Sequence, residues 1–314
     1  MARKVAAGRL PDLSTGDLGS VLVVRLKALG DIVLSLPIVY ALRERFPAAR
    51  IRYLCRGRYA GALAGVRALD EVLVLPESAF AQAALVRALR RAGIDCVLDL
   101  MGSPRSALIT RLRGAPVRIG MDTGRRNWCY THLLPRAIVR DGKRIMSYTL
   151  ESNRELIRML GLKPAAAPRL DIGFPAAEPE RPWAREYVKA LGAPAGRIVG
   201  IVPGSVYQAK SWPESSFIEL ARLLVARLGA LPLVLWGPGE RTIAGRVVAG
   251  APGAVLVPAM GVAKLGALIA EIDCLVGVDS GPKHLAVVQG TPTVTLFGPT
   301  DPRVWDPMTA KHRA

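Results

Sequence analysis

Residues 23–47 read VVRLKALGDIVLSLPIVYALRERFP, in which a short apolar run passes through a turn into a periodic apolar segment. The run Val21–Arg25 is rich in β-branched residues and is typical of a buried parallel strand. After Asp31, apolar residues recur at the spacing of one helix face, with a local distortion at Pro37. The stretch therefore predicts a strand, a tight turn and a helix, which is the repeating unit of a parallel α/β sheet.

The same alternation of strands and helices continues along the chain in two series. Further strands of the first series are expected at Ile51–Cys55, Glu71–Leu75, Cys96–Leu100 and Val117–Gly120, with a helix over Ala81–Ala92. The second series has expected strands at Ile198–Val202, Leu233–Trp236, Ala254–Val257, Cys274–Val278 and Thr293–Phe297, and a helix over Phe217–Leu228. Alternation of this kind predicts doubly wound parallel sheets in an α/β protein.

Five prolines between the two series indicate a linker. They stand among small and charged residues within 164–182, a composition typical of an interdomain connection. The length of 314 residues is about twice that of an ordinary domain, which agrees with a division into two. We therefore expect an N-terminal Rossmann-like domain over residues 1–163 and a C-terminal one over residues 183–314.

The chain is strongly basic, with 43 Lys and Arg residues against 25 Asp and Glu residues and a formal charge of +18. Most of the excess lies in residues 1–163, which hold 28 basic and 13 acidic residues, whereas residues 164–314 hold 15 and 12. A charge of this size implies an anionic partner without identifying it. Nucleic acid, a phosphorylated substrate and an acidic membrane surface all remain open, and each would meet the N-terminal half.

Composition also limits the chemistry that the chain can support. The four cysteines and three histidines form neither a CxxC pair nor a metal-ligand spacing, so no disulfide framework, metal site or cofactor is expected. No apolar run reaches the ~18 residues of a membrane-spanning helix, and residues 1–20 lack the apolar segment of a secretory signal. We therefore expect a cytoplasmic protein that contacts membranes only peripherally.

The turn Leu29-Gly30-Asp31 lies where the first strand meets its helix, at the edge where doubly wound sheets bind ligands. Gly30 allows a close approach of backbone or ligand. Asp31 has two interpretations: a helix N-cap, or a general base that takes a proton from an attacking hydroxyl. The single glycine does not match the GxGxxG fingerprint, which disfavours NAD binding.

Candidate phosphate contacts lie in the second half of the chain. Ser280 and Gly281 follow a strand and open an apolar helix, so their backbone amides form either an anion site for a diphosphate or an ordinary helix cap. Lys210, on the loop after Pro203-Gly204-Ser205, either neutralises a phosphate or stands in solvent. Glu240 either accepts hydrogen bonds from ribose hydroxyls or serves the first turn of a helix.

The densest basic cluster consists of six arginines: Arg105, Arg111, Arg113, Arg118, Arg125 and Arg126. A guanidinium fork suits phosphate better than an ammonium group does. Most charged runs are solvated faces, but residues 101–150 hold ten basic residues against Asp122 and Asp141. No aromatic residues are interleaved for base stacking, which counts against a nucleic-acid partner.

Three stretches together resemble glycosyltransferase family 9, the lipopolysaccharide heptosyltransferases. They are residues 23–47, quoted above, PGSVYQAKSWP at 203–213 and VGVDSGPKHLAVVQGTPTVTLFGPTDP at 276–302. The resemblance extends from about Val21 to Pro307. It implies the GT-B fold, in which two Rossmann-like domains face each other across a cleft, and an inverting, metal-independent transfer from ADP-L-glycero-D-manno-heptose.

The resemblance also implies roles for individual residues. Asp31 matches the family's catalytic base, Lys210 matches the lysine that contacts the donor diphosphate, and Glu240 matches the acid that reaches the donor ribose. The donor site is expected to consist of Gly204, Ser205, Lys210, Glu240, Asp279, Ser280, Gly281 and His284. The acceptor site in the N-terminal domain is expected to include Lys27, Gly30, Arg105, Arg125 and Arg126.

The reaction implied by the resemblance is transfer of heptose to a hydroxyl of the lipopolysaccharide inner core. The acceptor is then a phosphorylated glycolipid at the anionic inner face of the inner membrane, which suits a basic N-terminal domain, and no nucleic acid is expected as a partner. A GT-B glycosyltransferase that uses another nucleotide sugar is the alternative. A non-catalytic nucleic-acid-binding protein is a more distant one.

Three features depart from the family pattern. Lys27-Ala28 stands where relatives have small hydroxyl residues, so acceptor contacts are expected to differ. Lys283 occupies a position that is often apolar or small, where it either adds a cation near the diphosphate or faces solvent. The chain stops soon after Asp306-Pro307, whereas relatives usually continue into further helical segments, so we expect a truncated or a short member.

Overall fold

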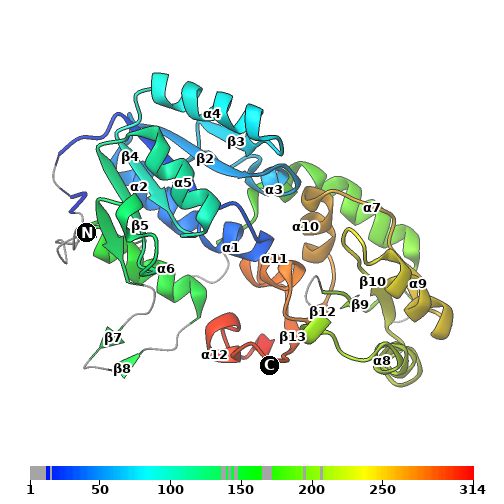
Figure 1. Ribbon diagram of the computed structural model, residues 1–314. Helices are drawn as coiled ribbons and strands as arrows, with labels where there is room; N and C mark the ends of the chain where they lie inside the picture. The colour runs from blue at the N-terminus through cyan, green and yellow to red at the C-terminus, as the bar shows by residue number, and fades with distance from the viewer. Residues whose placement is uncertain are drawn as a thin grey trace. The chain divides into compact units, whose positions relative to one another are not determined.

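The computed structural model describes residues 12–14, 16–135, 139–140, 143–144, 148–164, 172–193, 196–205 and 208–314. The chain divides into two compact units, Met1–Pro168 and Arg169–Ala314 (Figure 1). The division falls within residues 164–182, the stretch expected to be a linker.

The second part of that predicted linker is helical. Residues Pro175–Glu180 form the 3-10 helix η3, and Arg181–Leu191 form the helix α7. Pro175 and Pro182 stand in the first turns of these helices, where the missing backbone N–H leaves no hydrogen bond unmade. Residues 165–171 of the predicted linker lie outside the described residues.

Within the described residues, the first unit contains a six-stranded parallel sheet with the strand order β3-β2-β1-β4-β5-β6. Its strands are β1 (Ser20–Val24), β2 (Arg50–Arg56), β3 (Glu71–Leu75), β4 (Cys96–Asp99), β5 (Val117–Met121) and β6 (His132–Leu134). The first five were predicted to within one residue at either end, whereas β6 was not. Because the strand order reverses between β1 and β4, the loops after these strands flank the switch point where doubly wound sheets bind ligands.

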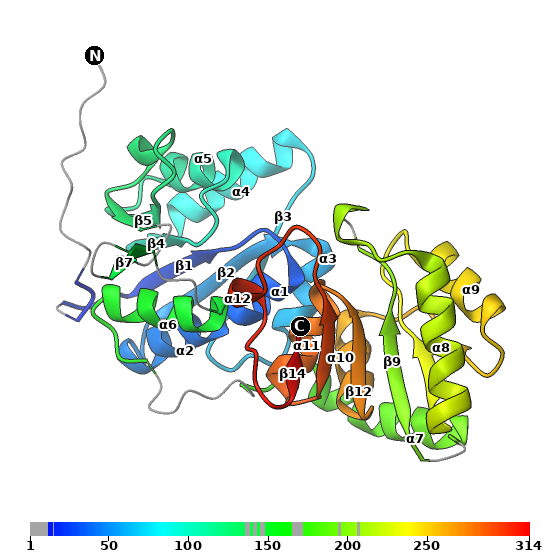
Figure 2. The same ribbon diagram turned by 90° about the horizontal axis from the view of Figure 1, so that it is seen from below.

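Helices cover both faces of this sheet (Figure 2). The helices α4 (Ala79–Arg91) and α5 (Pro104–Arg113) insert Leu89 and Ile109 into a core with Leu22 and Val97 of the strands. The opposite face carries α1 (Leu29–Leu34), α2 (Leu36–Arg45) and α6 (Thr149–Met159). Smaller elements of this unit are α3 (Gly57–Ala60), η1 (Gly61–Leu63), η2 (Asn127–Cys129) and the hairpin of β7 (Val139–Arg140) and β8 (Lys143–Arg144).

The helix predicted after Asp31 is interrupted, and two helices take its place. Ser35 separates α1 from α2; its hydroxyl donates to the carbonyl of Ile32 at 2.7 Å and lies 2.8 Å from the hydroxyl of Tyr53. Pro37 stands in the first turn of α2, where a proline fits without loss of a hydrogen bond.

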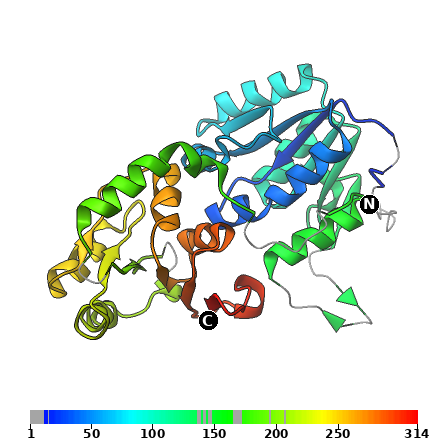
Figure 3. The ribbon, with the colours of Figure 1, turned by 180° about the vertical axis from the view of Figure 1, so that it is seen from behind.

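The second unit, seen from behind in Figure 3, repeats the α/β architecture. In the part of the chain that is described, its strand order is β11-β10-β9-β12-β13-β14. Its strands are β9 (Ile198–Val202), β10 (Leu231–Val234), β11 (Val255–Leu256), β12 (Cys274–Val278), β13 (Thr293–Leu296) and β14 (His312–Arg313). Its other elements are η4 (Gln208–Lys210), α8 (Glu214–Leu228), α9 (Arg241–Gly250), α10 (Val262–Ala270), α11 (Gly281–Gln289) and α12 (Pro302–Trp305). The sequence did not predict β14, because this polar two-residue strand carries no apolar pattern.

At Gly120 in β5, the neighbouring Tyr130 leaves no room for a side chain. A Cβ atom at this position would lie 2.2 Å from a ring carbon of the buried Tyr130. We expect Gly120→Ala to lower the free energy of unfolding of the first unit by about 2 kcal/mol, the usual cost of overpacking. Gly245→Ala is the control, because the space around this helical glycine is open and alanine favours a helix. Urea denaturation in which both variants unfold like the wild type would contradict the contact.

Candidate functional site

Asp31 lies in the first turn of α1, at the carboxyl end of β1. Its Oδ1 atom is 2.6 Å from Nη2 of Arg25, and its Oδ2 atom accepts a hydrogen bond from the backbone N–H of Ala28 at 3.2 Å. Asp31 is therefore the third residue of the helix and reaches back to the N-cap, rather than being the N-cap itself. The side chains of Arg25 and Asp31 are 21% and 19% exposed, so the carboxylate stays accessible to a small molecule.

Arg25 connects the loops that follow β1 and β4. Its Nε donates to the carbonyl of Lys27 at 3.0 Å, and its Nη1 donates to the carbonyl of Leu100. Sequence reasoning did not assign Arg25 to the site, although a cation at the end of an apolar strand was a usable signal. Of the two acceptor residues predicted beside it, Lys27 is exposed and Gly30 is buried within α1.

A second carboxylate, Asp99, closes β4 and was not predicted to belong to the site. It is fully buried and accepts hydrogen bonds from the Tyr130 hydroxyl at 2.7 Å and from the backbone N–H groups of Met101 and Gly102 at 2.9 and 3.1 Å. Burial raises the pKa of Asp99, and these hydrogen bonds oppose the rise. The carboxylate thereby fixes the loop that leads into α5.

The predicted arginine cluster separates into structural and accessible side chains. Nε of Arg118 donates to the carbonyl of Cys129 at 3.0 Å, and Nε of Arg126 donates to that of Gly102 at 3.0 Å, so these two guanidiniums brace loops. Arg105 on α5 and Arg125 before η2 are exposed. The structure therefore leaves Arg105 and Arg125 open to an anionic ligand.

In the second unit, Lys210 and Asp279 form an ion pair at the carboxyl edge of the sheet. Nζ of Lys210 lies 2.6 Å from Oδ2 of Asp279, and the two side chains are 19% and 3% exposed. The hydroxyl of Thr300 donates to the same carboxylate oxygen at 3.0 Å. These residues follow β9, β12 and β13, so one carboxylate joins three loops. Thr300 was not predicted to belong to the site.

The helix α11 begins at Gly281, as predicted, with Ser280 as its N-cap. The Ser280 hydroxyl makes no capping hydrogen bond to the helix. His284 is buried in this helix, and its Nε2 atom lies 3.8 Å from Oδ1 of Asp279. Burial, followed by the charges of Lys283 and Lys210, holds the pKa of His284 well below its usual value. The imidazole is therefore neutral at physiological pH.

The loops after β9 and β10 meet through Glu240. Its Oε2 atom accepts a hydrogen bond from the backbone N–H of Gly237 at 2.9 Å, at the N-cap position of α9. A Cβ atom at Gly204 would lie 2.5 Å from the carboxyl carbon of Glu240, so a larger residue here would displace this side chain. Ser205 follows and is half-buried. The predicted residues Gly204 and Glu240 are thus in contact.

Lys283 does not face solvent, so that alternative is wrong. It is buried, its Nζ atom lies 3.2 Å from Oδ2 of Asp306, and it donates to the carbonyl of Trp305. Burial lowers the pKa of Lys283, while the charge of Asp306 opposes the change. The ion pair fastens α11 to the segment that follows α12.

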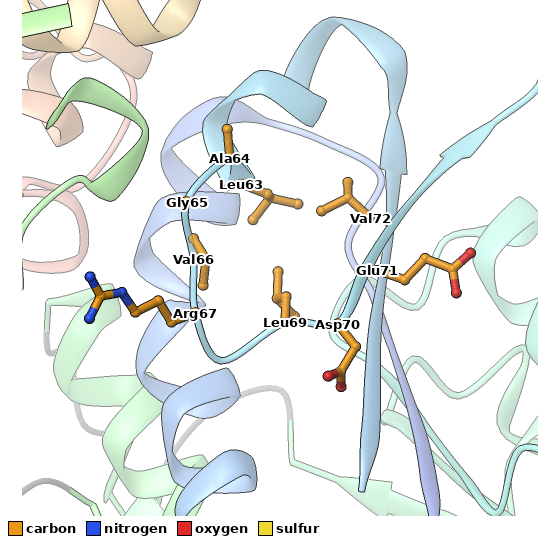
Figure 4. A pocket seen from close by; sticks show the side chains of 9 residues that line it. All are labelled: Leu63, Ala64, Gly65, Val66, Arg67, Leu69, Asp70, Glu71 and Val72. Atoms are coloured by element: carbon orange, nitrogen blue, oxygen red, sulfur yellow. The ribbon is translucent and has the colours of Figure 1, made fainter. Parts of the chain in front are cut away.

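Elsewhere, a hollow of about 340 Å³ lies between η1 and β3, lined by residues between Leu63 and Val72 (Figure 4). None of the residues predicted for the site lines it, and Asp70 at its rim is paired with Arg43 at 2.5 Å. Among the described residues, no helix is long and apolar enough to cross a membrane. No three His, Cys, Asp or Glu side chains of that part of the chain are grouped to hold a metal ion.

Comparison with known proteins identifies the class that this fold and site define. The sequence profile of glycosyltransferase family 9 (heptosyltransferase) matches residues 82–314. The chain therefore belongs to glycosyltransferase family 9 and is a glycosyltransferase, as the three sequence stretches predicted.

Individual relatives and solved structures narrow the comparison to heptosyltransferases. Lipopolysaccharide heptosyltransferase 1 of Pseudomonas aeruginosa is 26% identical over 295 residues, which cover 90% of this chain and 79% of the relative. The solved family 9 glycosyltransferase of Veillonella parvula has a TM-score of 0.78 at 23% identity and covers 98% of this chain and 86% of its own. The heptosyltransferase WaaC of E. coli, solved with ADP-2-deoxy-2-fluoro heptose, has a TM-score of 0.67 at 25% identity. The match covers 94% of this chain and 92% of the WaaC chain. The predicted GT-B class, with two Rossmann-like doubly wound domains, is confirmed.

The neutral state of His284 makes the stability of the protein depend on pH. Because its folded pKa lies well below the 6.5 of a free histidine, the unfolded chain binds the proton more readily, and stability is lost as the pH falls through about 6.5. From pH 7.5 to 5.5 one such group lowers the free energy of unfolding by roughly 1 kcal/mol. Urea denaturation at both pH values should show a smaller loss for His284→Gln than for the wild type. Equal losses in the two proteins would contradict a neutral His284.

Proposed function

We propose that this chain transfers heptose from ADP-L-glycero-D-manno-heptose to a hydroxyl of the lipopolysaccharide inner core, with inversion and without a metal ion. Family membership and the lipopolysaccharide heptosyltransferase relatives support the substrate class. The ADP-heptose analogue in the WaaC structure supports the donor. The Lys210–Asp279 ion pair beside the start of α11 carries the proposal, because it places a cation next to helix amides at a sheet edge suited to a diphosphate.

The donor occupies the carboxyl edge of the second sheet in this proposal. The ammonium group of Lys210, held by Asp279, meets the diphosphate together with the amides around Ser280 and Gly281. Charge grows on the diphosphate as the bond to the sugar breaks, so these groups stabilise the transition state more than the ground state. Glu240 offers its carboxylate to the ribose hydroxyls.

Asp31 is the general base of the proposed transfer. Its carboxylate takes the proton of the attacking hydroxyl while that oxygen forms the new bond to the anomeric carbon. The bond from that carbon to the diphosphate breaks, and its electron pair leaves with ADP. Arg25 holds Oδ1 at 2.6 Å and thereby fixes the orientation of the base.

The first unit binds the acceptor. Lys27 and Gly30 lie next to the base, Arg105 stands on α5, and Arg125 and Arg126 immediately precede η2, where Arg126 contacts the loop after β4. Their charges suit a phosphorylated glycolipid at the anionic inner face of the inner membrane, with the enzyme as a cytoplasmic, peripheral protein.

Replacement of the base separates chemistry from donor binding. We expect Asp31→Asn to lower kcat by about 100- to 10,000-fold, the usual contribution of a general base, and to leave ADP-heptose binding unchanged. The matched control is Asp17→Asn, an exposed aspartate of the same unit, which should retain wild-type turnover. Turnover is measured by mass spectrometry of a defined inner-core acceptor after incubation with ADP-heptose. Near-normal turnover of Asp31→Asn would remove this residue from the mechanism.

The donor site is tested by nucleotide binding, which also addresses a GT-B enzyme with another nucleotide sugar. We expect ADP to raise the melting temperature more than UDP or GDP at equal concentration. Lys210→Ala should weaken ADP binding by about 10- to 100-fold, the range for loss of a charge-assisted hydrogen bond, and Lys210→Arg should restore part of it. Lys189→Ala, an exposed lysine of α7, is the control. Preference for UDP or GDP would establish the alternative donor.

A further inference from the structure

Two neighbouring helices of the first unit lack acidic residues. No Asp or Glu occurs between Glu77 and Asp95, which enclose α4, or between Asp99 and Asp122, which enclose α5. The two helices lie side by side on one face of the sheet (Figures 1 and 2). All the charged side chains of α4 and α5 are therefore positive.

Large apolar side chains are exposed on the same surface. Phe80 of α4 is 81% exposed, and Leu108 and Leu112 of α5 are 49% and 42% exposed. Helical spacing places Phe80 in line with Arg87 and Arg91, and it places Arg111 and Leu112 one turn after Leu108. We call this surface the α4–α5 face; it consists of Phe80, Arg87, Arg91, Leu108, Arg111 and Leu112.

The cations of the α4–α5 face are not neutralised by the protein. In the described part of the chain, no carboxylate lies within ion-pair distance of Arg87, Arg91 or Arg111. The helix α8 shows the contrast, because it exposes Leu223 and Leu228 but carries Glu214 and Glu219 as well as arginines. An ordinary solvated helix mixes charges as α8 does.

We propose that the α4–α5 face docks on a lipid bilayer that contains anionic lipids. Exposed leucine and phenylalanine side chains between arginines are the composition of helices that lie in a membrane interface. The apolar side chains enter the acyl boundary, and the long arginine side chains keep their guanidiniums at the lipid phosphates. Phosphate of a nucleic acid would engage the arginines but would give no reason to expose Phe80, Leu108 and Leu112.

The position of the α4–α5 face suits an acceptor that is anchored in the bilayer. This interpretation rests on the proposed function. The helices α4 and α5 follow β3 and β4, so they begin at the carboxyl edge of the sheet, where Asp31 also lies. Phe80 stands in the first turn of α4 at that edge, and docking by these helices holds the unit that carries the base at the membrane surface. The binding itself is measured without donor or acceptor, so its failure is distinct from a failure of the proposed reaction.

Sedimentation with phosphatidylcholine vesicles, with and without phosphatidylglycerol, tests the docking. We expect the wild type to bind the anionic vesicles and to lose binding as salt is raised. The double variant Leu108→Gln/Leu112→Gln should lower the partition coefficient about tenfold through lost apolar contact. The double variant Arg87→Gln/Arg91→Gln should lower it on the order of tenfold and reduce its dependence on phosphatidylglycerol.

The matched control is Leu223→Gln/Leu228→Gln on α8, which should bind vesicles like the wild type. Phe80→Ser is a single change at a position that is 81% exposed, and it should also lower the partition coefficient. Unchanged melting temperatures exclude unfolding as the cause of lost binding. The proposal is overturned if the α5 variant binds like the α8 control, or if the wild type ignores lipid charge. It is equally overturned if the variants lose affinity for a short DNA duplex and keep affinity for vesicles.

Discussion

The carboxylate of Asp279 is 3% exposed, and a buried charge of this kind is stable only when its partners replace the lost water. Lys210 supplies the opposite charge at 2.6 Å, and Thr300 supplies a hydrogen bond at 3.0 Å. Because each partner comes from a different loop, compensation of the charge requires the ends of β9, β12 and β13 to keep their relative positions. The charge of Asp279 thus holds together the three loops at the carboxyl edge of the second sheet, where we place the donor.

The first unit also joins two loops through a charged side chain, here the cation Arg25. Arg25 follows β1 and binds both Asp31 and the carbonyl of Leu100, which follows β4. In both sheets the cation stands after the central strand, and its partners include the loop of the neighbour across the point where the strand order reverses. The loops after these paired strands lead to opposite faces of the sheet, so polar groups of the two loops have no sheet partner. In each sheet, a charged side chain bridges these two loops and satisfies some of these polar groups.

Most of the fold follows from short apolar runs, which is why the central strands of both sheets could be predicted from the sequence. The exceptions β6 and β14 have three and two residues, too few to show a pattern. The break at Ser35 depends on a contact with Tyr53 on β2, which no local pattern contains. In the site, the loops of Lys210 and Asp279 were predictable from their motifs, but Arg25 and Thr300 were not, because a side-chain partner is chosen in three dimensions.

The basic excess of the N-terminal half has two physical origins. Some guanidiniums are structural: Arg52 is buried against Glu71, and Arg118 braces a loop through the carbonyl of Cys129. Such residues add to the net charge but present little of it to a ligand, so the sequence total overstates the field at the surface. The α4–α5 face holds charge of the other kind, exposed and alternating with apolar side chains. Water alone would favour replacement of those apolar groups, whereas a boundary between water and hydrocarbon stabilises both kinds of side chain at once.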